Sequence, residues 1–308
     1  MTSTRRWLIV VQCGTTDRSR FGVPEHAYGW IVAQIGSGAK VMAARSLHGG
    51  ESPWWIDLMT SGGSAVTVVF RSLSSRINPE MIATNAAALA IAEQYDLPAP
   101  RLLGADLTGQ SVGAPATLET VVPGTGWPVE CSAELLRAAG AAMARVHAIR
   151  TKPSPVLPFR PRPIVIDDFA TERRLGRMPT TPLLTHADER LRAEPVPTAV
   201  SDVFVHGDLW PGNTVVAGKS VRGLIDWKLA GVGSPGVDLG ELRKQVAIVY
   251  GQDAPRFVLE GWERATDTRA LDIPYWDATA ALNTSTEYNG PESAARRDEF
   301  LSRAIAQL

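Results

Sequence analysis

The first third of the chain alternates between apolar runs and short polar turns. Three runs favour β-structure, residues 40–47, 53–59 and 66–71, and glycine-containing stretches typical of turns separate them. Side chains alternate across a pleated sheet, so in the third run one face is apolar and the other carries Arg71 near the strand end. The apolar face consists of Val66, Val68 and Phe70. The pattern predicts three strands of one antiparallel sheet.

Helical patterns dominate after about residue 122. Before that point a single alanine-rich helix is expected, from the capping residue Asn78 to about Gln94, with Pro79 in its first turn. An apolar run, 115–122, precedes Pro123-Gly124, and Ser132 can cap a following helix with apolar positions at helical spacing. These regimes predict an α+β fold with a small antiparallel-sheet lobe containing one helix, and a larger, mainly helical lobe.

Length and composition exclude several classes of protein. The 308 residues are 44% hydrophobic and carry a net charge of -1, a globular balance without the clustered cationic excess that nucleic-acid binding needs. No run approaches the roughly 18 apolar residues of a membrane span. Cys13 and Cys131 lie far apart without a metal-ligand pattern, so reduced thiols in the cytoplasm are expected. The apolar run 7–11 is too short for a secretory signal.

Candidate chemistry is concentrated between residues 204 and 238. The segment HGDLWPGN places Asp208 and Asn213 five residues apart on a loop, and Asp226 follows a short apolar run in IDW. Two carboxylates and an amide oxygen from neighbouring loops can converge on one oxygen-preferring Mg²⁺ ion bound to nucleotide phosphates. Phosphoryl transfer needs such a site and a carboxylate near the attacking hydroxyl. Taken singly, each motif is more typical of a loop turn or a helix cap than of a catalytic site.

In this order the motifs resemble those of the aminoglycoside phosphotransferase and choline-kinase-like family, relatives of protein kinases, over about residues 33–281. The resemblance implies a bilobal protein-kinase-like fold. Its expected divisions are an N-terminal extension (1–30), a nucleotide-binding lobe (31–118), a hinge (119–124) and a catalytic and acceptor-binding lobe (125–308). By the same resemblance Asp208 is the catalytic base, Asn213 and Asp226 bind Mg²⁺, and His206 and Asp238 support the loop. His147, on an apolar helix face, is expected to be packed.

The resemblance extends to the small lobe with one departure. Gly49, Gly50 and Ser52 resemble a nucleotide-phosphate loop, although a Gly-Gly pair is also typical of a plain hairpin turn. The cation where the family has lysine is Arg71, and the helix position of its glutamate partner holds Asn85. Glu80 or Glu93 is a substitute candidate; alternatively Arg71 is an exposed strand-end charge.

The connection between the lobes is the third part of the expected nucleotide site. Backbone groups from about Glu119 to Val121 resemble the family's purine-binding segment, with ATP or GTP as donor.

The acceptor is the least specified part of the site. Acidic residues outnumber basic ones from residue 201 onward, which suits a cationic acceptor such as an aminoglycoside, another amino sugar or choline. Candidates in the region that resembles the family's acceptor wall are Glu241, Asp272, Asp277, Glu287 and Trp276. Each has a plainer interpretation, surface ion pairing for the acids and core packing for the tryptophan.

The sequence therefore predicts a Mg²⁺-dependent kinase, monomeric or homodimeric, that phosphorylates a hydroxyl of a small molecule. Antibiotic-like acceptors are included, and neither a nucleic acid nor a membrane is an expected partner. A nucleotide-binding pseudokinase is the alternative, because Arg71 and Asn85 replace the usual pair. A hydrolase using Asp208 and His206 is a weaker interpretation, because no GxSxG motif accompanies them.

Overall fold

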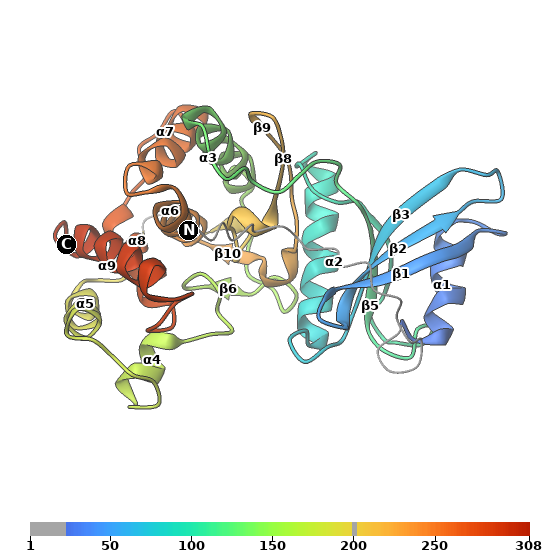
Figure 1. The fold of residues 1–308 in the computed structure, drawn as a ribbon, viewed down its shortest axis with the longest axis horizontal. Helices are drawn as coiled ribbons and strands as arrows, with labels where there is room; N and C mark the ends of the chain where they lie inside the picture. Colours follow the sequence, from blue (N-terminus) through green and yellow to red (C-terminus); the bar gives the residue numbers. More distant parts are fainter. Residues whose placement is uncertain (1–22, 199–201) are drawn as a thin grey trace, which may run out of the picture. The chain divides into compact units, whose positions relative to one another are not determined.

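A computed structural model of the protein describes residues 23–198 and 202–308. The chain divides after Pro123 into two compact units (Figure 1). The apolar run 7–11 and Cys13 lie outside the described residues. None of the helices in the described ranges is both long and apolar enough to cross a membrane.

The first unit is built on a five-stranded antiparallel sheet. Its strands are β1 (Lys40–His48), β2 (Glu51–Met59), β3 (Ala65–Ser72), β4 (Leu102–Asp106) and β5 (Ala116–Thr120), in the spatial order β1-β2-β3-β5-β4. The three strands expected from the alternating pattern are confirmed. Strand β4 was not expected, because its five residues lie between a proline-rich stop and a polar turn. The order places β3 beside β5, although a helix and β4 separate them in sequence.

Two helices cover opposite faces of this sheet (Figure 1). Helix α1 (Glu25–Ile35) covers the apolar face, where Ala27 and Ile31 share a core with Val68 and Phe70. Helix α2 (Pro79–Gln94) covers the other face. The expectation of one helix was therefore incomplete, and residues 25–30, assigned to an extension, form the first part of α1, which packs on the sheet through Ala27. Helix α1 escaped notice because no side chain caps its start.

The caps inferred from sequence are present. The Asn78 side chain accepts a hydrogen bond from the Met81 amide at 2.9 Å and begins α2. In the second unit, the Ser132 hydroxyl accepts from the Leu135 amide at 3.2 Å and begins α3 (Ala133–His147). Each cap satisfies an amide that has no partner within its own helix, which explains why both starts are readable from sequence.

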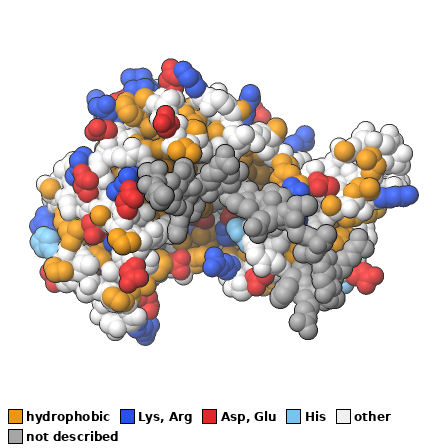
Figure 2. Space-filling view, in the orientation of Figure 1, with side chains coloured by type: hydrophobic (Ala, Val, Ile, Leu, Met, Phe, Trp, Pro, Cys, Tyr) orange, Lys and Arg blue, Asp and Glu red, His pale blue; other side chains and the backbone are white. Residues whose placement is uncertain are grey.

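The second unit is mainly helical. Besides α3 it contains α4 (Phe169–Arg174), α5 (Pro182–Ala193), α6 (Gly236–Tyr250), α7 (Ala254–Thr266), α8 (Ile273–Leu282) and α9 (Pro291–Ile305). Helices α3 and α7 lie side by side (Figure 1). Charged side chains of both signs are interspersed over the face drawn in Figure 2, in keeping with the net charge near zero.

Short strands in this unit hold the loops that carry the candidate chemistry. Strands β6 (Phe159–Arg160), β10 (Gly231–Gly233) and β7 (Val203–Val205) form one small sheet. Strands β8 (Thr214–Ala217) and β9 (Ser220–Leu224) form a hairpin. The loop from β7 to β8 carries Asp208 and Asn213, and the segment after β9 carries Asp226. Both lie on the same small scaffold.

Candidate active site

The chain turns sharply after β7, and this turn presents Asp208. Gly207 has a φ of 79°, and a Cβ there would lie 2.1 Å from the carbonyl oxygen of Leu229. Only glycine combines the left-handed conformation with this close approach. Asp208 follows directly, with its side chain 15% exposed.

Asp238, at the start of α6, binds the backbone of the turn that presents Asp208. Its carboxylate accepts hydrogen bonds from the amides of His206 and Gly207, each at 2.8 Å. His147 contacts it through Nε2 at 3.0 Å, and Trp262 donates to the other ring nitrogen at 2.9 Å. Because Nδ1 accepts, Nε2 carries the proton and donates to Asp238. His147 is therefore packed and hydrogen-bonded, as expected.

The pKa of Asp238 reflects these contacts. Burial alone would raise it, but the hydrogen bonds from the His147 ring and the His206 amide hold the pKa of the Asp238 carboxyl below its ordinary value. The carboxylate is therefore ionised when it binds the turn.

His206 links the loop to the segment that carries Asp226. Its Nε2 donates to the carbonyl of Ile225 at 2.9 Å, while its Nδ1 accepts from the Asp208 amide at 3.4 Å. The ring is fully buried and packs on Trp227, with centroids 4.5 Å apart. Burial lowers the pKa of His206, which keeps the ring neutral, as its accepting Nδ1 requires.

The structure brings Asp208, Asn213 and Asp226 together. Asn213 closes the short helix η1 (Pro211–Asn213), and its side-chain amide donates to the Asp208 carbonyl at 2.8 Å. Its backbone carbonyl accepts from the Ile225 amide at 2.9 Å. Asp226 adopts a left-handed conformation, with a φ of 66°, two residues after the end of β9. Hydrogen bonds of His206 and Asn213, which flank Asp208, therefore join this loop to Ile225, the residue before Asp226.

This donor set fits a magnesium ion bound to a nucleotide. Asn213 donates through its nitrogen, which assigns its Oδ1 as the atom that can face a cation, and Asp226 adds a carboxylate. Mg²⁺ is commonly held by one or two protein oxygens together with substrate phosphates and water. The described residues contain no group of three or more His, Cys, Asp or Glu side chains that could hold a metal by themselves.

The sequence analysis missed Lys228. This residue lies in the short helix η2 (Trp227–Leu229), and its Nζ contacts Oδ2 of Asp226 and lies 3.8 Å from Oδ2 of Asp208. Its place in the sequence, two positions after Asp226, was the only local indication that Lys228 belongs to the site.

Asp208 has an unusual electrostatic setting. Burial raises the pKa of its carboxyl to about 7, and Lys228 opposes the rise, whereas the charges of Asp226 and Glu241 reinforce it. A carboxylate with a pKa near neutrality is suited to accepting a proton from an alcohol.

In the first unit, the glycine turn between β1 and β2 is organised by Ser46. Its hydroxyl accepts from the amides of His48 and Gly50, each at 3.0 Å, and donates to the carbonyl of Glu51. Gly49 and Gly50 both have positive φ values. Ser52 lies outside this turn: it is buried in β2, and its hydroxyl accepts from the Ser72 amide at 2.8 Å. Ser52 is therefore not part of the glycine turn, as the resemblance implied, and its hydroxyl instead links β2 to β3.

Arg71 is buried and ion-paired. Its Nη2 lies 3.3 Å from Oε1 of Glu119, and both side chains are 4% exposed. Asn85 of α2 donates to Thr117 at 3.3 Å and to Glu119 at 3.5 Å. The interpretation of Arg71 as an exposed charge was wrong. Arg71 pairs with Glu119 on β5. The two substitute partners expected from the sequence do not take this role, because Glu80 is exposed and Glu93 pairs with Arg101.

This geometry also changes the interpretation of Glu119. The residue lies inside β5, paired with Val69 of β3 and Leu102 of β4, so its backbone belongs to the sheet and its side chain faces Arg71. A purine-binding backbone segment has to begin beyond β5, where Val121 lies.

The acceptor candidates fall into two groups. Trp276 is buried against α6, where a Cβ on Gly236 would lie 2.1 Å from its ring, and Asp277 forms a buried ion pair with Arg243 at 2.9 Å. Neither is available to an acceptor, because core packing and internal pairing occupy them. Glu241 is also buried, pairing with Lys244 at 2.7 Å. Asp272 and Glu287 are exposed.

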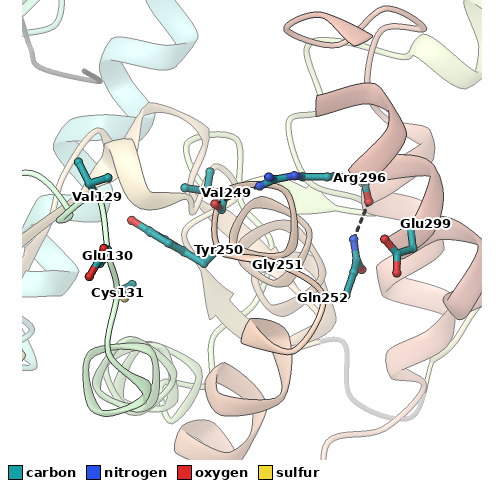
Figure 3. A pocket seen from close by; sticks show the side chains of 9 residues that line it. All are labelled: Val129, Glu130, Cys131, Val249, Tyr250, Gly251, Gln252, Arg296 and Glu299. Carbon is teal, nitrogen blue, oxygen red and sulfur yellow. Dashed lines mark hydrogen bonds between the residues drawn. The ribbon is translucent and has the colours of Figure 1, made fainter. Parts of the chain in front are cut away.

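Two cavities in the second unit lie away from Asp208. An open cavity of about 580 Å³ is lined by Tyr250, Arg296 and Cys131, among others, and Gln252 donates to the Arg296 carbonyl on its wall at 2.8 Å (Figure 3). Burial raises the pKa of the Cys131 thiol to about 11, so it stays protonated. A second cavity, of about 360 Å³, lies beside α4, α5 and α8. Neither lining includes the candidate catalytic residues.

The second unit holds Asp208 and Asn213 on one loop and Asp226 just after the adjoining hairpin, and the first unit is built on a five-stranded antiparallel sheet. This combination is that of the protein-kinase-like class of proteins. The chain belongs to the phosphotransferase enzyme family, whose model matches residues 45–282. The suspected relationship and the α+β, bilobal fold class are thereby confirmed. No curated protein sequence matches the chain.

Solved structures with the same fold cover nearly the whole chain. A candidate aminoglycoside phosphotransferase from Ralstonia eutropha JMP134 has a TM-score of 0.62 at 16% identity, covering 92% of this chain and 94% of its own. A macrolide 2'-phosphotransferase from Brachybacterium faecium has a TM-score of 0.53 at 17% identity, with 88% and 92% covered. The aminoglycoside phosphotransferase APH(4)-Ia, in a ternary complex with AMP-PNP and hygromycin B, has a TM-score of 0.59 at 14% identity, with 92% and 98% covered. At these identities the similarity concerns the fold.

Proposed function

We propose that the protein is a Mg²⁺-dependent small-molecule kinase that transfers the γ-phosphate of ATP or GTP to an alcohol group. The observation that carries the proposal is the convergence of Asp208, Asn213 and Asp226 on one small scaffold. Such a carboxylate–amide–carboxylate set supplies both a base and oxygen ligands for a nucleotide-bound ion.

In the proposed reaction, Asp208 orients the acceptor hydroxyl and takes its proton as the oxygen attacks the γ-phosphorus. The bond to the β-phosphate oxygen breaks, and the nucleoside diphosphate leaves. Asn213 and Asp226 would hold Mg²⁺, which neutralises phosphate charge when bound. The surrounding residues keep this geometry: Asp238 and Gly207 fix the turn, and His206 ties it to the Asp226 segment.

The nucleotide contacts of the first unit are part of the proposal. The glycine turn at Gly49 and Gly50 can approach phosphates closely, because its tip carries no side chains; the Gly49 amide is proposed to face them, since the Gly50 amide donates to Ser46. The ion pair of Arg71 with Glu119, whose carboxylate also accepts from Asn85, is proposed to replace the lysine–glutamate pair of the family, with the acid supplied by β5. Backbone groups around Val121 are proposed to bind the purine.

The acceptor is proposed to be an antibiotic-like molecule, an amino sugar or another small metabolite. Support comes from the solved relatives, among which are macrolide and aminoglycoside phosphotransferases. Exposed Asp272 and Glu287 remain acceptor candidates for a cationic ligand.

A second candidate function is nucleotide binding without turnover. The observation in its favour is the burial of Arg71 against Glu119, because a guanidinium neutralised inside the unit differs from the lysine of an active kinase.

An acceptor screen distinguishes the two. Aminoglycosides, macrolides, amino sugars and choline are incubated with the protein and either ATP–Mg²⁺ or GTP–Mg²⁺, and phosphorylated products are identified by mass spectrometry. A phosphorylated alcohol that requires the protein supports the kinase. Nucleotide binding without any product across the panel supports the second candidate.

A further inference from the structure

The ammonium group of Lys228 lies between the two candidate catalytic carboxylates. Its Nζ contacts Oδ2 of Asp226 and is 3.8 Å from Oδ2 of Asp208, and the lysine side chain is only 14% exposed. These acids come from different segments, so the lysine joins the catalytic turn to the segment after β9. This position is where positive charge is needed in a phosphoryl-transfer site.

The local structure holds Lys228 in this position. Asp226 adopts a left-handed conformation, and the next residue, Trp227, is fully buried. The Trp227 ring stacks on Phe204 with an interplanar angle of 1° and donates to the Leu224 carbonyl at 2.8 Å. Because Trp227 is fixed in the core, the backbone of Lys228 is held next to Asp226, and its side chain lies beside both aspartates.

Lys228 is the cation that lies against both Asp208 and Asp226. Among the described residues, the charges of Lys228, Asp226 and Glu241 act on Asp208. Glu241 is already neutralised by Lys244 at 2.7 Å and hydrogen-bonded by Gln245 at 2.9 Å. With Lys228 beside both carboxylates, their negative charge is partly balanced; without it, that charge has no adjacent cation among these groups. The site would then attract divalent cations more strongly.

We propose that Lys228 is a resident cation that takes the place of one divalent ion. By binding Asp226 and lying beside Asp208, it limits the nucleotide complex to a single divalent ion held by Asn213 and Asp226. This inference rests on the proposed kinase function. It assigns Lys228 a positioning and charge-balancing role, whereas Asp208 takes the proton.

The test counts Mn²⁺ ions by electron paramagnetic resonance titration in the presence of AMP-PNP or its guanine counterpart. Wild type is expected to bind one Mn²⁺ per nucleotide. Lys228→Met is expected to bind two, and to bind Mn²⁺ without nucleotide at least tenfold more tightly than wild type. Lys228→Arg keeps the charge and is expected to bind one. Lys219→Met is the matched control, because Lys219 is 69% exposed and pairs with Glu134.

The outcomes separate this inference from the function on which it rests. Two Mn²⁺ ions in wild type, or one in Lys228→Met with unchanged affinity, overturn the resident-cation role while leaving a kinase intact. Absence of any nucleotide-dependent Mn²⁺ binding by wild type overturns both. Circular dichroism and Tm establish that each variant is folded. If Lys228→Met does not fold, Lys228→Gln replaces it, with the same expected Mn²⁺ count and affinity.

Discussion

Arg71 and Glu119 form a buried ion pair on the sheet face covered by α2. With both side chains 4% exposed, neither charge can be left alone without a large desolvation cost. Asn85 adds a hydrogen bond to the same carboxylate. The strength of such a pair is best measured by removing its members one at a time and then together.

We expect Arg71→Met and Glu119→Met each to lower the free energy of unfolding by roughly 3 kcal/mol, because each leaves one buried charge unpaired. The double variant should lose much less than the sum, since both charges are gone. Denaturant unfolding measures this cycle. Arg101→Met is the control: its pair with Glu93 is exposed and should be worth less than about 1 kcal/mol. Additive losses from the two single variants would contradict the buried pairing.

Asp238 gives the turn that carries Asp208 a pH-dependent stability. Its pKa is below its ordinary value of 3.8 in the folded protein, so its contribution is fully present above the unfolded pKa and is lost as pH falls through the folded one. We expect Asp238→Asn to cost roughly 3 kcal/mol at pH 7, the scale of removing one member of a buried charged network. The difference from wild type should shrink below about pH 4. Urea unfolding at pH 7 and pH 3.5 measures it, and an undiminished difference at low pH would refute the ionic role.

At the level of elements, glycines allow α3 and α7 to pack closely. A Cβ on Gly140 would lie 2.0 Å from the carbonyl oxygen of Val258, and one on Gly261 would lie 2.0 Å from that of Arg137. Both obstacles are backbone atoms, so the helices themselves would have to move. The pair supports His147 and Trp262, which reach Asp238 and hence the turn.

Gly140→Ala and Gly261→Ala should each destabilise the protein by roughly 2 kcal/mol, the cost of overpacking a close contact. Gly29→Ala in α1 is the matched control, because nothing lies within 4 Å of its added Cβ and the residue is exposed. That variant should gain up to about 1 kcal/mol from helix propensity. Thermal and urea unfolding measure all three. Equal effects at the three positions would mean that helix packing is not the cause.

The sequence predicted those elements whose ends are marked by local chemistry. Helices α2 and α3 begin at the capping residues Asn78 and Ser132, and β1 to β3 are bounded by glycine turns. Helix α1 has no side-chain cap, and β4 is only five residues long, so neither has a comparable local signal.

The candidate site divides in the same way. Asp208, Asn213 and Asp226 lie in contiguous motifs on one scaffold and were identified. The Arg71–Glu119 pair depends on β3 pairing with β5 across 48 residues, which no local pattern reveals. Lys228 was visible in the sequence, but its position between two carboxylates depends on how two loops meet.

At the scale of the whole molecule, the phosphotransferase family match spans 238 residues that include both the glycine turn and the Asp226 segment. Nucleotide binding should therefore stabilise the folded chain by mass action. A nucleotide at 100 times its Kd contributes about 2.7 kcal/mol.

We expect ATP–Mg²⁺ or GTP–Mg²⁺ to raise Tm by several degrees, and the same nucleotide with EDTA to raise it less, since Asn213 and Asp226 would bind it through the metal. Differential scanning fluorimetry measures both. Asp226→Asn should lose the metal-dependent part of the shift. A shift that is indifferent to Mg²⁺ in wild type would argue against this metal site.

The most direct test of the central claim is transfer of labelled γ-phosphate to an acceptor identified by the screen, comparing wild type with Asp208→Asn. A carboxylate that accepts the hydroxyl proton predicts a loss of turnover of roughly 10³-fold, with the nucleotide Kd changed only a few-fold. Turnover within a few-fold of wild type in a folded Asp208→Asn protein would contradict the assignment.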